Sequence, residues 1–221
     1  MSRRTELLVR AADCYERAEM HADAARCFQD AGRLVSAGKA YNAAGDLARA
    51  ADCFRAGNEP AAAAALYAEL GQPAAAADCW ESVGDRLSAG WVLATQTREI
   101  HRAMRLLGEV TVRDTGRRLR RDLGVGVCRA KADRRSELLE RALLACESEL
   151  ARVPRDDERR QVEEWAVVAA SLVNRTDLAA RVLAASYRCG TRGAAERWRR
   201  WGAANLGGTF GVPEREPVRP G

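Results

Sequence analysis

Cysteine and histidine are the residue types in this sequence that could ligate a metal ion or supply a nucleophile with its base. There are seven cysteines and two histidines. Four of the cysteines recur at intervals of 13 or 26 residues: Cys14, Cys27, Cys53 and Cys79. No C-x-x-C pair occurs, and His21 and His101 belong to no H-E-x-x-H motif and no Ser-His-Asp arrangement. We therefore expect no metal site. We expect the recurring thiols to be small buried hydrophobic groups, with Cys128 the one most open to exposure.

Glycine motifs that cradle phosphates are incomplete in this chain. Gly124 and Gly126 begin a G-x-G, but Arg129 stands where the third glycine of a dinucleotide fingerprint belongs. No G-x-x-x-x-G-K-[ST] occurs, and the acidic residues are scattered rather than paired at a shared apolar site. These absences predict a protein that is not an enzyme and that uses no cofactor.

Arginine clusters are the remaining chemical signal. One run supplies five of them: Arg113, Arg117, Arg118, Arg120 and Arg121. A second cluster lies beside two tryptophans: Arg197, Trp198, Arg199, Arg200 and Trp201. Arginine with nearby aromatic rings can hold phosphates and stack on bases. Acidic residues adjoin both runs, however, and no nucleic-acid reader module is present. A docking surface for an acidic protein or a solvated face is the favoured interpretation, and nucleic acid is the less favoured partner.

A repeat of 13 residues organises the first half of the chain. From Ala11 onward, seven consecutive blocks align without a gap. Position one is always alanine, position five is aromatic in six blocks, and position nine is glycine in four. At roughly 100° per residue, positions one, four, five and eight share one stripe of a helix, opposite positions three, six and seven. Each block therefore predicts one short amphipathic helix and a turn, with the glycine as a left-handed helix cap.

Alternate blocks differ, which makes the unit a helical hairpin of 26 residues. The even blocks carry Phe or Trp at position five, whereas the odd blocks carry a tyrosine ladder: Tyr15, Tyr41 and Tyr67. These tyrosines either line a groove that holds a peptide or pack between helices with only the hydroxyl in water. The predicted contact residues are those on the polar face of the odd helices: Asp13, Glu16, Arg17, Lys39, Asn42 and Glu69.

The repeat resembles a known class of helical scaffolds. The strings AADCFRAG and KAYNAAGDLARAADCF are similar to tetratricopeptide-type repeats, and more closely to the A-A-x-x-[YF]-x-x-A-G-[DN] pattern of soluble NSF attachment protein-like and coatomer-like α-solenoids. The resemblance covers residues 5–100, and the period departs from the tetratricopeptide period of about 34 residues. It implies a stacked α-solenoid with a scaffolding role, and it names no partner.

The second half is predicted to be helical but irregular. Helices are expected at 97–107, 113–123, 136–153, 157–175, 177–187 and 194–206. The segment from Gly124 is expected to be a connection, and either Asp156 or Asp157 is expected to cap the helix that follows Pro154. Residues 5–100 would then form the repeat domain, 101–206 a C-terminal helical region that continues or caps it, and 207–221 a disordered tail.

Charge and hydrophobicity complete the prediction. Residues 1–96 hold 10 basic and 13 acidic side chains, whereas residues 97–221 hold 26 and 18. No apolar run is long enough to cross a bilayer, and the first residues lack the apolar core of a signal peptide. The alanine and arginine bias is typical of a bacterial genome rich in G and C. We expect a cytoplasmic, all-α, non-enzymatic scaffold or adaptor that binds a protein or peptide within a larger assembly. The alternative is a nucleic-acid-associated adaptor that uses the arginine-rich half.

Overall fold

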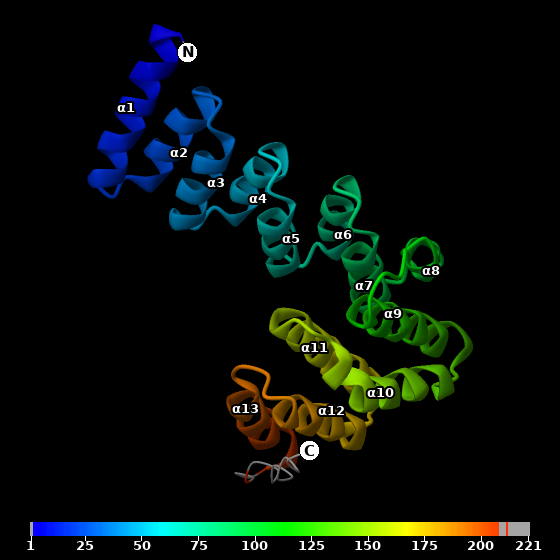
Figure 1. The fold of residues 1–221 in the computed structure, drawn as a ribbon. Coiled ribbons are helices and arrows are strands. Elements are labelled where there is room, and N and C mark those ends of the chain that lie inside the picture. Colours follow the sequence, from blue (N-terminus) through cyan, green and yellow to red (C-terminus); the bar gives the residue numbers. More distant parts are fainter. Residues whose placement is uncertain (1, 208–210, 212–221) are drawn as a thin grey trace. The chain divides into compact units, whose positions relative to one another are not determined.

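The protein is entirely helical over the part of the chain that its structure describes. A computed structural model describes residues 2–207 and 211, and over these residues it contains thirteen α-helices, one 3₁₀ turn and no strand (Figure 1). The predicted all-α fold class is confirmed. The chain divides into two compact units between Thr97 and Arg98. Among the described residues, no helix combines the length and the apolar character that a bilayer span requires.

The first unit is a stack of short helices in which each helix packs on the next along the chain. Figure 1 shows this succession from the blue N-terminal helix to the green α7. The helices are α1 (Arg3–Arg17), α2 (His21–Asp30), α3 (Leu34–Ala43), α4 (Leu47–Ala56), α5 (Pro60–Glu69), α6 (Pro73–Ser82) and α7 (Arg86–Gln96). Helices α2 to α6 contain ten residues each, and three residues connect each to the next. The predicted rhythm of one helix and one turn per repeat is therefore present.

Each turn of the repeat closes in the same way. The residue at position nine has a positive φ in all six turns, from 58° at Glu19 to 80° at Gly45. The N–H group at position ten then donates to the carbonyl at position five of the preceding helix, as Asp46 does to Tyr41 at 2.9 Å. This is the Schellman arrangement, which satisfies the last carbonyls of a helix and fixes the exit of the chain. The predicted cap holds even where position nine is not glycine, at Glu19 and Asn58.

The core of the first unit rests on two small columns rather than one. Position one is buried from Ala24 onward, as predicted. Position two, which the stripe did not include, is also buried in all seven blocks and is always alanine or glycine. Position eight was wrongly assigned to the core, since the helix ends before it and Ala44 and Val83 are exposed there. Small residues at both columns let neighbouring helices approach on two sides.

The second unit contains helices of unequal length. They are α8 (Ile100–Gly108), α9 (Thr115–Asp133), α10 (Glu137–Glu149), α11 (Asp156–Leu172), α12 (Thr176–Arg188) and α13 (Ala194–Leu206), with the 3₁₀ turn Leu150–Arg152 after α10. Asp114 caps α9 by accepting from the Arg117 N–H at 2.7 Å. The cap of α11 is Arg155, so the prediction of Asp156 or Asp157 was wrong. Asp156 is the first residue of the helix and accepts the N–H of Arg192 at 3.1 Å.

The segment predicted to be a connection after Gly124 is instead the second half of α9. Its glycines are needed for close packing. A Cβ at Gly124 would lie 2.9 Å from Leu107 Cδ1, and one at Gly126 would lie 2.8 Å from the Cα of Leu139 in α10. Glycine in this helix therefore marks contact with neighbouring elements, which sequence periodicity does not reveal. The predicted tail falls on residues 208–210 and 212–221, which lie outside the described residues.

Candidate partner-binding groove

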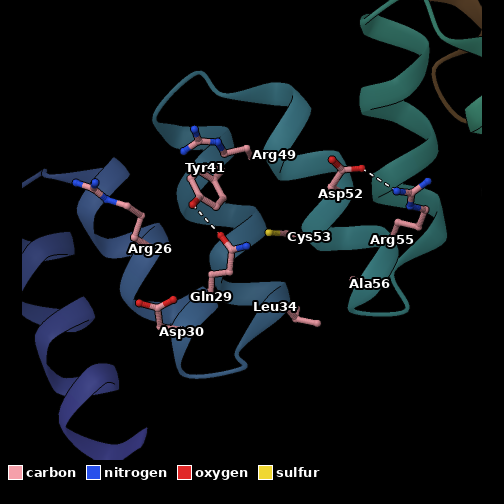
Figure 2. A pocket seen from close by; sticks show the side chains of 10 residues that line it. All are labelled: Arg26, Gln29, Asp30, Leu34, Tyr41, Arg49, Asp52, Cys53, Arg55 and Ala56. Carbon is pink, nitrogen blue, oxygen red and sulfur yellow. Dashed lines mark hydrogen bonds and ion pairs between the residues drawn. The ribbon is translucent and has the colours of Figure 1, made fainter. Parts of the chain in front are cut away.

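A groove runs along α2 and α4 with α3 between them. Its cavity volume is about 700 Å³. The residues that line it are Arg26, Gln29 and Asp30 of α2, Leu34 and Tyr41 of α3, and Arg49, Asp52, Cys53, Arg55 and Ala56 of α4. Figure 2 shows their side chains gathered on this face, with Tyr41 between the two even helices.

The repeat places the polar rim of this groove. Arg26 and Asp52 occupy position three of their blocks, and Gln29 and Arg55 occupy position six. These are polar positions of the even helices α2 and α4. The sequence analysis assigned partner contact to the equivalent positions of the odd helices. The structure shows that the hollow surface with this lining belongs to the even helices instead.

Tyr41 joins the odd helix α3 to this surface. Its side chain is only 2% exposed, so the ring packs between helices. The Tyr41 hydroxyl donates to Gln29 Oε1 at 2.8 Å, and the Arg49 guanidinium lies 5.6 Å from the centre of the ring. This is cation–π geometry, which holds the arginine over the aromatic face. The hydroxyl and the two side chains around it form one connected polar cluster on the groove.

Tyr67 repeats this arrangement with other partners. Its hydroxyl donates to Asp52 Oδ1 at 2.6 Å, and Arg55 Nη2 reaches the same oxygen at 2.9 Å. Arg55 also lies 5.6 Å from the centre of the Tyr67 ring. Burial, with the hydrogen bond to Asp52, raises the pKa of Tyr67 to about 12, so the hydroxyl keeps its proton and remains a donor at neutral pH. Asp52 is therefore an engaged acceptor.

Of the two interpretations of the tyrosine ladder, the packed one describes Tyr41 and Tyr67. Their rings are 2% and 5% exposed, and only their hydroxyls reach the polar surface. Tyr15 is different, being 36% exposed, because α1 lies at the end of the described stack and no further helix covers its ring. The ladder thus contributes hydroxyl groups to the groove and does not contribute a row of exposed rings.

Each arginine of the groove has an acidic neighbour three residues earlier on its own helix. Arg26 pairs with Asp23, Arg49 Nε lies 3.3 Å from Asp46 Oδ2, and Arg55 pairs with Asp52. The arginine side chains are 65%, 63% and 57% exposed. Exposed pairs of this kind contribute about 0.3–0.5 kcal/mol each. The arginines are therefore positioned by these pairs without being committed to them.

The odd-helix residues predicted to contact a partner do not line the groove. All six are exposed: Asp13, Glu16, Arg17, Lys39, Asn42 and Glu69. Arg17 is partly held by its own helix, since its Nε donates to the Asp13 carbonyl at 3.1 Å. The odd-helix surface thus remains a prediction, separate from the groove and carrying none of its tyrosine hydroxyls.

The predicted basic patch of the second unit is largely paired within that unit. Arg118 donates to Glu149 at 2.6 Å, and Arg121 pairs with Asp122 at 2.8 Å. Arg120 Nη1 donates to Gln161 Oε1 at 2.5 Å, and its guanidinium lies over the Trp165 ring. Arg113 is exposed, and Arg117 is half-buried.

The second arginine cluster is also engaged. Arg197 pairs with the buried Glu163, and Arg200 pairs with Glu196 at 2.7 Å. Arg199 is exposed, and the rings of Trp198 and Trp201 lie 6.3 Å apart. Neither cluster is a continuous positive surface of unpaired arginines.

The cysteines follow the local packing rather than one rule. Cys53 and Cys79 are buried and Cys27 is half-buried, but Cys14 is exposed, so the prediction that all four are core residues was wrong at α1. Cys128, predicted to have the best chance of exposure, is fully buried in α9. Burial raises the pKa of Cys128 to about 11 and also raises the pKa of Cys53 in the groove. The Cys53 thiol is therefore protonated at neutral pH and acts as lining.

The groove is equipped to bind rather than to react. Its side chains offer guanidinium, amide and hydroxyl groups above a floor of small and apolar residues. Within residues 2–207 and 211, no group of three His, Cys, Asp or Glu side chains is arranged to hold a metal ion. Comparison with protein-family models, curated proteins and solved structures gave no match to this chain.

Sequence reasoning missed the even-helix positions although one signal pointed to them. Position five, which carries the tyrosines, lies on the opposite side of the helix from the polar positions three, six and seven of the same block. The tyrosine hydroxyls therefore had to meet residues of a neighbouring helix. The recurring D-x-x-R spacing at Asp46–Arg49 and Asp52–Arg55 marks the helix that supplies them.

Proposed function

We propose that this protein is a non-enzymatic scaffold or adaptor of the cytoplasm, and that its first unit binds a segment of a partner protein in the groove over α2, α3 and α4. The observation that carries the proposal is the groove itself, a hollow of about 700 Å³ in which hydrogen-bonding side chains from three successive helices meet. The resemblance of the repeats to tetratricopeptide-like and soluble NSF attachment protein-like solenoids supports the same role.

The repeat explains why such a groove would hold its shape. The turns on either side of α3 are closed by the same hydrogen bonds, Arg33 to Phe28 at 2.8 Å and Asp46 to Tyr41 at 2.9 Å. The Tyr41 hydroxyl then links α3 to α2. A surface that is already ordered loses less conformational entropy when a partner binds. The same pairing that orders the groove leaves the second unit with little unpaired positive charge, which disfavours the nucleic-acid alternative.

The proposal is tested by blocking the groove without changing its charge. Ala56 lies in the lining at the end of α4 and is exposed, so Ala56→Trp would fill the groove with little effect on the core. Ala43→Trp, at an exposed position outside the lining, is the matched control. Proteins that co-purify with the tagged chain from its native host would be identified, and the strongest would be purified and titrated by calorimetry against each variant.

We expect a partner whose affinity falls by at least about tenfold with Ala56→Trp and stays within about twofold with Ala43→Trp, because only the first substitution occupies the groove. The double variant Lys39→Ala with Asn42→Ala tests the odd-helix surface and should have little effect. Loss of binding with that double variant alone would assign contact to the odd helices. Binding that no variant weakens would contradict the groove.

A further inference from the structure

The end of the groove around Tyr41 carries more hydrogen-bond donors than acceptors. Arg49 uses its Nε on Asp46 and Arg26 uses its Nη2 on Asp23. Within the described residues, no hydrogen bond uses either Nη nitrogen of Arg49, the Nε and Nη1 of Arg26, or the amide nitrogen of Gln29. Five donor nitrogens on three side chains therefore face solvent around one tyrosine.

The acceptors of the lining are engaged or lie elsewhere. Gln29 Oε1 receives the Tyr41 hydroxyl, and Asp52 Oδ1 receives both Tyr67 and Arg55. Asp30 lies one helical turn beyond Arg26 on α2, on the side of Gln29 that faces Leu34 (Figure 2). The cluster formed by Arg26, Gln29, Tyr41 and Arg49 thus lacks an acceptor that only a ligand would supply.

We propose that this cluster, named here the donor cluster, binds a carboxylate side chain of an acidic segment in the partner protein. The inference rests on the proposed function and specifies the chemistry of the partner. An arginine can hold a carboxylate through two parallel N–H groups, and Arg49 has both Nη nitrogens available for this geometry. The Gln29 amide and Arg26 would complete the binding of the same carboxylate.

The surroundings favour a short acidic segment over a long polyanion. The first unit as a whole is acidic, with 10 basic and 13 acidic side chains in residues 1–96. A nucleic acid laid across it would meet net repulsion outside the donor cluster. A single carboxylate, in contrast, meets a local excess of positive charge. The exposed pairs with Asp23 and Asp46 are weak enough for a partner carboxylate to share the arginines.

The test uses two synthetic peptides and fluorescence anisotropy on the full chain. The probe is fluorescein-labelled Ala-Glu-Glu-Glu-Glu-Ala, and its uncharged counterpart carries glutamine at the four central positions. We expect the glutamate peptide to bind and the glutamine peptide to bind at least about tenfold more weakly. Arg49→Gln should weaken the glutamate peptide by about tenfold, Gln29→Leu by about threefold, and Arg49→Lys by an intermediate factor because a lysine lacks the planar fork.

A matched variant separates the donor cluster from general attraction to a basic chain. Arg152→Gln removes the same charge from a side chain that is 73% exposed in the second unit, and it should leave binding unchanged. Circular dichroism should be unaltered for Arg49→Gln, whose side chain is 63% exposed. Equal weakening by Arg49→Gln and Arg152→Gln, or equal binding of the two peptides, would overturn the inference.

Failure of this inference can be told apart from failure of the proposed function. If neither peptide binds but a purified partner still loses affinity with Ala56→Trp, the groove binds a protein by other chemistry and only the acidic segment is wrong. If the partner is also insensitive to Ala56→Trp, both proposals are wrong. Binding of the glutamate peptide that Arg49→Gln does not weaken assigns it to another surface and overturns the inference.

Discussion

The two units of this protein build their cores from different materials. In residues 2–97 the buried columns are alanine and glycine with about one aromatic ring per helix, and five of the helices are ten residues long. In the second unit the helices range from nine to nineteen residues, and nearly all of the largest fully buried side chains of the described chain, mostly leucine and valine, lie there. That unit also buries a charged side chain, Glu163, which is 1% exposed.

The difference shows how each unit specifies its structure. A repeat is fixed by local rules, since the same cap and the same small columns recur in every block and each helix needs only its neighbours. The second unit depends on contacts between residues far apart in the sequence, such as those of Gly126 with Leu139 and of Glu163 with Arg197. Substitutions of these two kinds should therefore differ in size and in reach.

Loss of the buried carboxylate should have the largest effect. Glu163 receives Arg197 Nε at 2.5 Å and Nη2 at 2.8 Å, and it also accepts the Ser186 hydroxyl. Glu163→Ala would leave both donors without an acceptor, and we expect it to lower the free energy of unfolding by about 3–5 kcal/mol. Chemical denaturation measures this, and hydrogen exchange should place the loosening in α11 to α13.

The neighbouring residue provides the control for that experiment. Glu164 is 53% exposed and pairs with Arg160 at 3.6 Å on the same helix. Glu164→Ala should change the free energy of unfolding by less than about 0.5 kcal/mol. Similar losses from the two substitutions would show that the buried pair does not hold the second unit together.

Overpacking of an alanine column should have the largest effect within the first unit. Ala51 is fully buried at position two, against neighbouring helices on a side that the predicted stripe left out. Ala51→Leu should cost about 1–3 kcal/mol, because the added carbons force the helices apart. Ala48→Leu, at an exposed position of the same helix, should be nearly neutral. Equal melting temperatures for the two variants would mean that position two is not a packing column.

The turns of the repeat should respond more weakly and with a definite sign. Gly45 has a φ of 80° and open space around it, so Gly45→Ala should cost about 1–2 kcal/mol through backbone strain alone. Gly108 ends α8, also with open space around it, but it lacks a positive φ. Gly108→Ala should therefore stabilise by about 0.4–1 kcal/mol. Thermal unfolding of the pair tests whether the caps of the first unit are conformational; shifts of the same sign would refute this.

Thiol reactivity should show the smallest structural effect and the clearest contrast. Cys14 is exposed, whereas Cys128 and Cys146 are fully buried, and burial raises the pKa of Cys128 to about 11. At pH 8 a disulfide reagent should modify Cys14 within minutes and leave Cys128 and Cys146 intact until the protein unfolds. The variant Cys14→Ser should remove the fast phase, and a fast phase that persists would place an exposed thiol elsewhere.

Much of the first unit could be predicted from its sequence because its determinants are local. The cap at Gly45 and the burial of Ala50 follow from position alone. The sequence did not reveal that position two is buried or that Tyr41 reaches Gln29, since both depend on which helix lies alongside. The same limit explains α9, where Gly124 and Gly126 read as a break but serve close packing. The groove escaped prediction because even and odd helices supply it together.

The central claim is that the partner lies in the groove of the even helices. It is tested most directly by placing a photo-crosslinking amino acid in turn at position 29 in the groove, at position 42 on the odd-helix face and at position 113 in the basic run. Each form would be irradiated with the purified partner. We predict a covalent adduct from position 29, abolished by Ala56→Trp, and little from the other two. An adduct from position 42 or 113 with none from position 29 would contradict the account.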